Sequence, residues 1–209
     1  MFRLAENPRL RALHTVPNAL PTNIYFDGSP AFIGLAFGQV SDYRDFIQGH
    51  HRLQVFLVEA GGQEVEVLDA EIEDLGINRD YTLVLTGLLP DIHTLLLVDS
   101  TSAPGHNRAK VRLLHTSPDA PALDMVVLRG PTLFKGVSFR EITPFQEISA
   151  RTVDLEVRPS GSPQSIMSVP DYTFSAGHLY TFVALGLLNG TPGFMVMPLV
   201  EAVEMLSPA

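Results

Sequence analysis

The chain contains the same motif twice, and this repeat limits the fold more than any other feature of its 209 residues. The sequence RALHTVPNA at residues 11–19 returns as RLLHTSPDA at residues 112–120, 101 positions later. Two copies of one unit must reach the same fold with different side chains. The repeat also provides an internal comparison, because chemistry that the unit requires should be present in both copies.

The agreement extends along both copies. FIGLAF at 32–37 aligns with FKGVSF at 134–139, VSDYRDFI at 40–47 with ITPFQEIS at 142–149, and YTLVLTGL at 81–88 with YTFVALGL at 180–187. A period of about 100 residues is far longer than the roughly 20–50 residues of solenoid repeats, so each copy is expected to fold by itself. We predict a first domain at residues 1–100 and a second at 108–209, joined by the polar segment 99–108 with its Pro-Gly pair.

Composition excludes several classes of function. The chain has no cysteine, which rules out disulfides, thiolate metal sites and cysteine nucleophiles. Its formal net charge of −9 disfavours binding to nucleic acids and to anionic membrane surfaces. No apolar run is long enough for a transmembrane helix, and the first residues lack the apolar region of a signal peptide. We therefore expect no nucleic acid partner and no membrane insertion, and the oligomeric state stays open.

Strand signals dominate the chain. Segments such as 54–58 and 81–85 are rich in β-branched and aromatic residues, and 16 Gly and 16 Pro interrupt the chain at short intervals. The sequence predicts an all-β fold of two tandem immunoglobulin-like or transthyretin-like antiparallel β-sandwich domains. In the first copy, strands are expected near residues 9–15, 22–27, 31–37, 52–58, 63–73, 80–87 and 92–98. The segment 42–48 is expected to form a helical turn at most.

The alternation of acidic residues changes phase within the strand expected at 63–73. Positions 64 and 66 are acidic, and then positions 69, 71 and 73. Because successive side chains on a strand point to opposite faces, this change predicts a β-bulge or a break at Val67–Leu68. The acids from Glu64 to Asp74 therefore point away from one another, which favours a solvated edge strand over a calcium site. The neighbours His50 and His51 also face opposite sides, so they do not form a pair of metal ligands.

The motif and two later stretches resemble a known family. RLLHTSPDAPALD at 112–124, AFGQVSDY at 36–43 and YTLVLTG at 81–87 are similar to the signature of a bacterial family of domains of unknown function, number 4397. The resemblance implies tandem β-sandwich modules, often found on exported or cell-surface proteins, and it implies no activity. An extracellular or cell-envelope location would follow from it, although no signal peptide is visible. Asn18 and Asn23 stand where the second copy has Asp119 and Asp124, so a role that needs carboxylates there is not shared by both copies.

We interpret the repeated motif as a structural corner of the fold. Its residues are Arg11, His14, Pro17 and Asn18 in the first copy, and Arg112, His115, Pro118, Asp119 and Asp124 in the second. Each histidine shares a strand face with apolar residues, which predicts a buried ring hydrogen-bonded to the backbone of a turn. The Asx residue after each proline is expected to accept a hydrogen bond from its own backbone two residues on. The arginines face the opposite way and are expected to form structural or surface pairs of small energy, for instance Arg112 with Asp124.

No catalytic, cofactor-binding or metal-binding residue is predicted. His115, Ser117 and Asp119 suggest a Ser–His–Asp triad, but residues two apart on an extended strand are separated by about 6.6 Å, too far for the required hydrogen bonds. The first copy has Val16 and Asn18 at the serine and aspartate positions. A catalytic role for these three residues is therefore disfavoured, and no cofactor is expected.

These observations favour a non-catalytic binding or structural module, acting at a cell envelope or surface or within a larger assembly. Its ligand is unknown, and the partner is expected to be a protein or a glycan. The alternative is a carbohydrate- or peptide-binding module that uses a groove between the two domains. A weaker alternative is a hydrolase or metal enzyme built on His115, Asp119 and Asp124.

Overall fold

A computed structural model describes residues 7–99 and 102–202, and every regular element in them is a β-strand. The chain divides into two compact units, Met1–Ser100 and Thr101–Ala209, and each is described by itself. The expected linker starts at Asp99, which is the last residue of a strand, and its residues 100 and 101 lie outside the described residues. Most of the N-terminal segment considered for a signal peptide, residues 1–6, also lies outside them.

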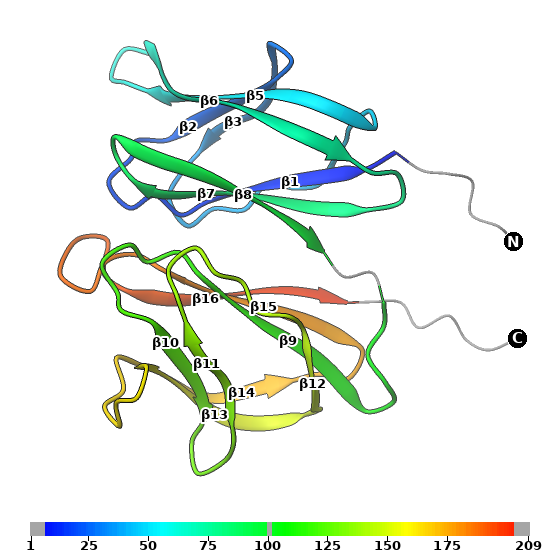
Figure 1. Ribbon diagram of the computed structural model, residues 1–209, viewed down its shortest axis with the longest axis vertical. Helices are drawn as coiled ribbons and strands as arrows, with labels where there is room; N and C mark the ends of the chain where they lie inside the picture. The colour runs from blue at the N-terminus through cyan, green and yellow to red at the C-terminus, as the bar shows by residue number, and fades with distance from the viewer. Residues whose placement is uncertain (1–6, 100–101, 203–209) are drawn as a thin grey trace, which may run out of the picture. The chain divides into compact units, whose positions relative to one another are not determined.

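The first unit is a sandwich of two four-stranded sheets (Figure 1). Its strands are β1 (Arg9–His14), β2 (Thr22–Phe26), β3 (Ser29–Leu35), β4 (Arg44–Asp45), β5 (Gly49–Val58), β6 (Glu64–Leu75), β7 (Asp80–Leu88) and β8 (Asp91–Asp99). One sheet has the order β4-β1-β7-β8 and the other the order β3-β2-β5-β6. The strands β3 and β4 therefore lie at sheet edges.

The second unit repeats this topology. Its strands are β9 (Arg108–His115), β10 (Leu123–Val127), β11 (Thr132–Val137), β12 (Gln146–Ser149), β13 (Arg151–Pro159), β14 (Met167–Phe174), β15 (His178–Leu185) and β16 (Met195–Ala202). The sheet orders, β12-β9-β15-β16 and β11-β10-β13-β14, are those of the first unit with every strand displaced by eight. The prediction of an all-β fold of two sandwiches is confirmed.

One pair of strands in each unit is parallel, so the sheets are not all antiparallel as expected. β1 pairs with β7 in parallel, with Leu10 opposite Tyr81, and β9 pairs with β15 in the same way. A parallel pair needs a long crossover connection, and here β2 to β6 supply it in the first unit. The pairing joins the beginning of each unit to its last hairpin.

The seven strands expected in the first copy are all present, with ends that differ by at most three residues. The helical turn expected at 42–48 is wrong, because Arg44 and Asp45 form β4 and pair with β1. The Phe46 amide then donates to the Pro8 carbonyl oxygen at 2.9 Å. The backbone of this segment is thus satisfied by a distant strand rather than by a local turn.

The β-bulge expected in the acidic strand is confirmed. Val55 lies opposite Leu68 and Phe56 lies opposite Glu66, so Val67 is the extra residue of β6. The acids on either side of Val67 consequently change phase without leaving the solvated face.

Each unit encloses its own apolar core between its two sheets. Leu10, Ala12, Ile24, Leu53 and Leu83 are all at most 1% exposed in the first unit. The second core contains Leu113, Leu123 and Leu155 together with the aromatic residues Phe174 and Phe182. The cores therefore occupy equivalent places with different side chains.

Candidate functional site

The two motif histidines are fully buried, and each bridges the turn that follows its strand. Nδ1 accepts a hydrogen bond from the amide two residues on, at 3.2 Å for His14 and 3.3 Å for His115. Nε2 faces a carbonyl oxygen, that of Leu20 at 3.4 Å and that of Pro121 at 3.0 Å. Burial lowers the pKa of both rings, although the carbonyl groups act in the opposite direction. One nitrogen accepts and the other donates, which is the pattern of a neutral ring.

The Ser–His–Asp arrangement considered above is not formed by these residues. The hydroxyl of Ser117 donates to the Gly186 carbonyl oxygen at 2.7 Å, and it lies 3.5 Å from Asp119 Oδ1. Both nitrogens of the His115 ring face backbone groups. The serine and the histidine side chains therefore lack the contact that would activate a nucleophile.

Asn18 and Asp119 hold the turn between the last two strands of their units. Asn18 Oδ1 accepts from the Leu89 amide at 3.0 Å. The two oxygens of Asp119 accept from the amides of Leu188 at 2.8 Å and Asn189 at 3.0 Å. Parallel pairing of the first strand with the seventh brings these segments together, although they are about 70 residues apart along the chain.

The Asx-turn expected at Asp119 is therefore wrong. Two residues after Asp119 lies Pro121, which has no N–H to donate. Its carboxylate turns instead to the distant hairpin, and Asn18 does the same with a single bond. An amide oxygen suffices for this contact, which explains why Asn and Asp alternate at the position.

Asn23 and Asp124 have a second role, since each stabilises a bulge in the edge strand beside it. Oδ1 of each accepts from a glycine amide at 2.7 Å, that of Gly34 or that of Gly136. These glycines have φ values of +69° and +68°, a left-handed conformation that disfavours a side chain. The other oxygen of Asp124 accepts from the Gly161 amide. Asp124 is thus engaged by its own sheet, and the expected pair with Arg112, which lies in the other sheet, is wrong.

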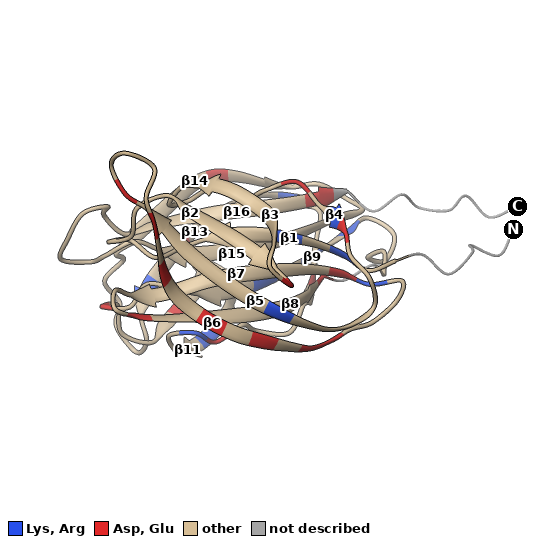
Figure 2. Cartoon of the chain, turned by 90° about the horizontal axis from the view of Figure 1, so that it is seen from above, with Lys and Arg blue, Asp and Glu red and all other residues tan. Residues whose placement is uncertain are grey.

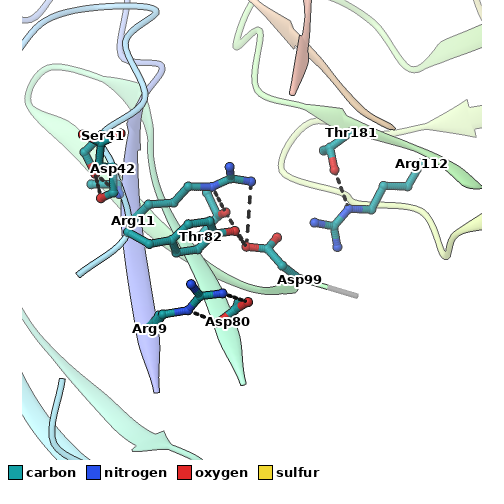
Figure 3. Close-up of polar contacts among 11 residues, drawn as sticks. Arg9, Arg11, Ser41, Asp42, Asp80, Thr82, Asp99, Arg112 and Thr181 are labelled. Carbon is teal, nitrogen blue, oxygen red and sulfur yellow. Dashed lines mark hydrogen bonds and ion pairs between the residues drawn. The ribbon is translucent and has the colours of Figure 1, made fainter. Parts of the chain in front are cut away.

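The motif arginines are buried. Figure 3 shows Arg11 beside Thr82 and Asp99. Arg11 Nε donates to Thr82 Oγ1 at 2.9 Å, and its Nη2 lies 3.9 Å from Asp99 Oδ2. The hydroxyl groups of Thr82 and Tyr43 both donate to that same carboxylate oxygen. Arg112 repeats the first contact, with Nε donating to Thr181 Oγ1 at 2.8 Å. Of the two expectations, structural or surface pairs, these buried contacts match the structural one.

The acidic residues of β6 are spread along one edge strand (Figure 2). Arg52 pairs with Asp69, with Nε–Oδ1 at 3.0 Å, and His50 Nε2 lies 3.0 Å from Glu71. Among residues 7–99 and 102–202, no three His, Asp or Glu side chains gather where they could hold a metal ion. The strand thus forms separate cross-strand pairs.

A hollow in the first unit lies between β3 and the segment 44–47. Its volume is about 340 Å³, and its walls include the aromatic rings of Phe26 and Phe46, 4.6 Å apart between centroids. Asp27, Arg44 and His51 bring charged or polar groups to it. A second hollow of about 240 Å³ shares Arg44 and is lined by Phe32, Ile33 and Asp42, among others. The larger hollow combines aromatic walls with polar and charged groups, and both kinds of group occur in ligand sites.

His51 connects two sides of the larger hollow. Its Nδ1 lies 2.7 Å from Asp27 Oδ2 and its Nε2 lies 2.7 Å from the Ile47 carbonyl oxygen. Both partner atoms are oxygens, so each ring nitrogen of His51 has a polar contact of its own. The bond from His51, with a second from the Arg52 amide, lowers the pKa of Asp27. The turn after β2 is thus tied to the segment before β5.

The second unit has different side chains at the corresponding positions. Val153 occupies the place of His51, because His51 pairs with Ile72 and Val153 with Tyr172 at the same step of the sheet. The exposed residues Ile33 and Ile47, 60% and 74% accessible, correspond to Lys135 and Ser149. The His51–Asp27 pair is thus a feature of the first copy.

Sequence reasoning missed this site, because its residues come from four separate segments. His51 was considered only as a metal ligand beside His50, and Asp27 is 24 positions away. The repeat did contain a signal, since aligning the copies places a histidine opposite a valine and two isoleucines opposite polar residues.

Comparison with known families gives one match: the family described as Domain of unknown function (DUF4397) matches residues 8–126, more than half of the chain. The chain belongs to this family. The DUF4397 match covers the first unit from the end of its N-terminal segment and continues through β9 and most of β10. It is a single match, so the duplication itself is established by the strand order of the two units.

Other comparisons add little to the DUF4397 assignment. No curated protein matches the chain significantly. Among solved structures, a "putative cell adhesion protein" from Bacteroides fragilis is 10% identical, with 97% of this chain and 99% of that chain covered and a TM-score of 0.20. A score this low carries no argument about fold or function. In the described part of the chain, no helix is long and apolar enough to cross a membrane.

Proposed function

We propose that this DUF4397 chain is a non-catalytic, immunoglobulin-like binding module that acts at a cell surface or envelope, and that its ligand occupies the hollow of the first unit. The surface location is supported by family membership, because modules of this family are expected on exported proteins. The binding role is supported by the hollow itself, with its aromatic walls and its His51–Asp27 pair.

The repeated motif supports a non-catalytic role. Its histidines, Asx residues and threonines are engaged by backbone groups of their own unit, as when Thr15 and Thr116 donate to the carbonyl oxygens of Leu85 and Ala184. Side chains committed in this way stabilise the fold, and they leave no nucleophile and base in contact. Function is therefore assigned to the side chains that differ between the copies.

The test is a ligand screen on the full chain, read by nuclear magnetic resonance with peptides, glycans and small polar molecules. We expect compounds that bind to change the chemical shifts of Phe46, Ile47 and His51 most. His51→Val, which copies the second unit, should weaken these compounds at least about tenfold, equal to about 1.4 kcal/mol. His93→Val, at a half-buried histidine of β8, is the matched control. Shifts that gather elsewhere, or turnover of a compound at the hollow, would overturn the proposal.

A further inference from the structure

The net charge of the chain is concentrated in its first half. Residues 1–100 contain 6 Arg and 14 Asp or Glu, whereas residues 101–209 contain 8 Lys or Arg and 9 Asp or Glu. The first half thus carries a formal charge of −8 and the second a charge of −1. A field of this size attracts a cationic partner to the first unit and repels a second copy of the same unit.

The two hollows of the first unit combine this charge with exposed apolar side chains. Asp27 and Asp45 line the larger hollow and Asp42 lines the smaller, and all three are exposed. Ile47 lines the larger hollow and Ile33 the smaller. Their exposure, 74% and 60%, is far above that of core residues. Carboxylates beside exposed isoleucines suit a ligand that alternates cationic and apolar groups.

Arg44 is shared by the two hollows of the first unit. Its guanidinium lies over the Phe32 ring, 5.7 Å from the centroid, in a cation–π contact. Arg44 lines both hollows, so a ligand that spans them passes this residue.

The equivalent edge of the second unit carries different side chains. Lys135 replaces Ile33 on the edge strand β11, and a lysine at such a position prevents association through the edge. Ser149 replaces Ile47, and Pro144 replaces Asp42. The first unit has lost this protection at the place where its acids gather.

We propose that the two hollows of the first unit bind an extended segment of a partner protein in which lysine or arginine alternates with apolar residues. This inference rests on the proposed function and names the ligand class of the same site. Ile33 and Ile47 contact the apolar side chains of the segment, and Asp42 and Asp45 contact its cationic ones.

The experiment measures binding of the full chain to the blocked peptide KLKLKLK by calorimetry, with KSKSKSK and ELELELE as comparison peptides. We expect KLKLKLK to bind at least about tenfold more tightly than either comparison peptide. KSKSKSK lacks the apolar side chains, and ELELELE carries the opposite charge. The double variant Ile33→Lys with Ile47→Ser, which copies the second unit, should remove this preference. Leu128→Ser, at an exposed apolar residue of the second unit, should retain it.

Position must be separated from net charge by a second pair of variants. Asp42→Asn with Asp45→Asn should weaken KLKLKLK at least about tenfold, whereas Glu59→Gln with Glu73→Gln changes the net charge equally and should have little effect. Equal binding of KLKLKLK and KSKSKSK, or equal loss in both double variants, would overturn the inference in favour of unspecific attraction. If KLKLKLK fails while glycans from the screen still shift the resonances of the hollow, this ligand class is wrong and the proposed binding site stands.

Discussion

The two units place their aromatic residues differently. In the second unit Tyr172, Phe174, Tyr180 and Phe182 pack against one another inside the core, with Phe174 and Phe182 1% exposed. The core positions of Phe174 and Phe182 hold leucines in the first unit, where Phe26 and Phe46 line the larger hollow. The second unit thus keeps its ring cluster inside the core, whereas in the first unit two packed rings also reach the wall of the proposed ligand site, although both units have the same topology.

The comparison separates what the two units share from what differs between them. The corner motif, the bulge glycines and the parallel pair are the same in both copies, because each unit needs them to fold. Exposed side chains such as Ile33 and Ile47 can differ between the copies, because the fold does not depend on them. The comparison between the units therefore indicates where function lies.

The largest effect should follow from Phe174→Ala. Removing a fully buried ring should destabilise the second unit by about 3–5 kcal/mol, whereas Phe46→Ala, at a half-buried ring, should cost the first unit roughly 1 kcal/mol. Native-state hydrogen exchange measures the opening free energy of each unit separately. Equal losses of stability in the two variants would show that Phe46 contributes to its core as much as Phe174 does, which would contradict the distinction between the two units.

A smaller effect is expected where the Asx residues hold the last hairpin. Asp119→Ala removes two hydrogen bonds and Asn18→Ala removes one, so the losses should be about 2 and 1 kcal/mol. Exchange of the Leu188 and Leu89 amides reports each contact directly. Asp119→Asn keeps one acceptor oxygen, so it should lose less stability than Asp119→Ala. A loss as large as that of Asp119→Ala would contradict the interchangeability of Asn and Asp at this position.

The smallest difference between the units is expected in their response to acid. Burial lowers the pKa of His14 and of His115, so the unfolded chain binds a proton at a higher pH than the folded chain does. Stability should therefore be retained above the ordinary pKa of about 6.5 and fall as the pH drops through that value towards the lowered one. Both units should lose stability together, as seen by exchange at pH 7.5 and 5.5.

Removal of the titrating rings sharpens this prediction. In the double variant His14→Asn with His115→Asn, the loss between pH 7.5 and 5.5 should shrink in both units, whatever the variant costs at neutral pH. An unchanged pH dependence would show that other groups cause the acid response.

Much of the fold could be predicted, because strand periodicity and turns are local. The strand positions followed from runs of β-branched and aromatic residues, and the bulge at Val67 followed from the parity of the acids. The helical turn at 42–48 failed because Arg44 and Asp45 pair with β1, more than thirty positions earlier in the chain. Local pattern carries no information about such a distant partner.

The candidate site divides in the same way. The burial of His14 and His115 followed from their strand face, whereas the partners of Asp119 and Arg11 did not. Those partners lie on hairpins that approach only through the parallel pair β1–β7 or β9–β15. The hollow could not be foreseen either, since its walls come from β2, β3, β4 and β5.

By itself, the sequence determined that this protein is a duplicated β-unit whose shared motif belongs to the fold. Repetition and alternation are properties of the linear sequence, so they can be recognised without the three-dimensional structure. Tertiary structure alone decided that Asp27 meets His51 and that Ile33 and Ile47 stay exposed beside carboxylates. The physical reason is that a site of this kind is made by edges of two different sheets, and only the packing of the sandwich brings those edges together.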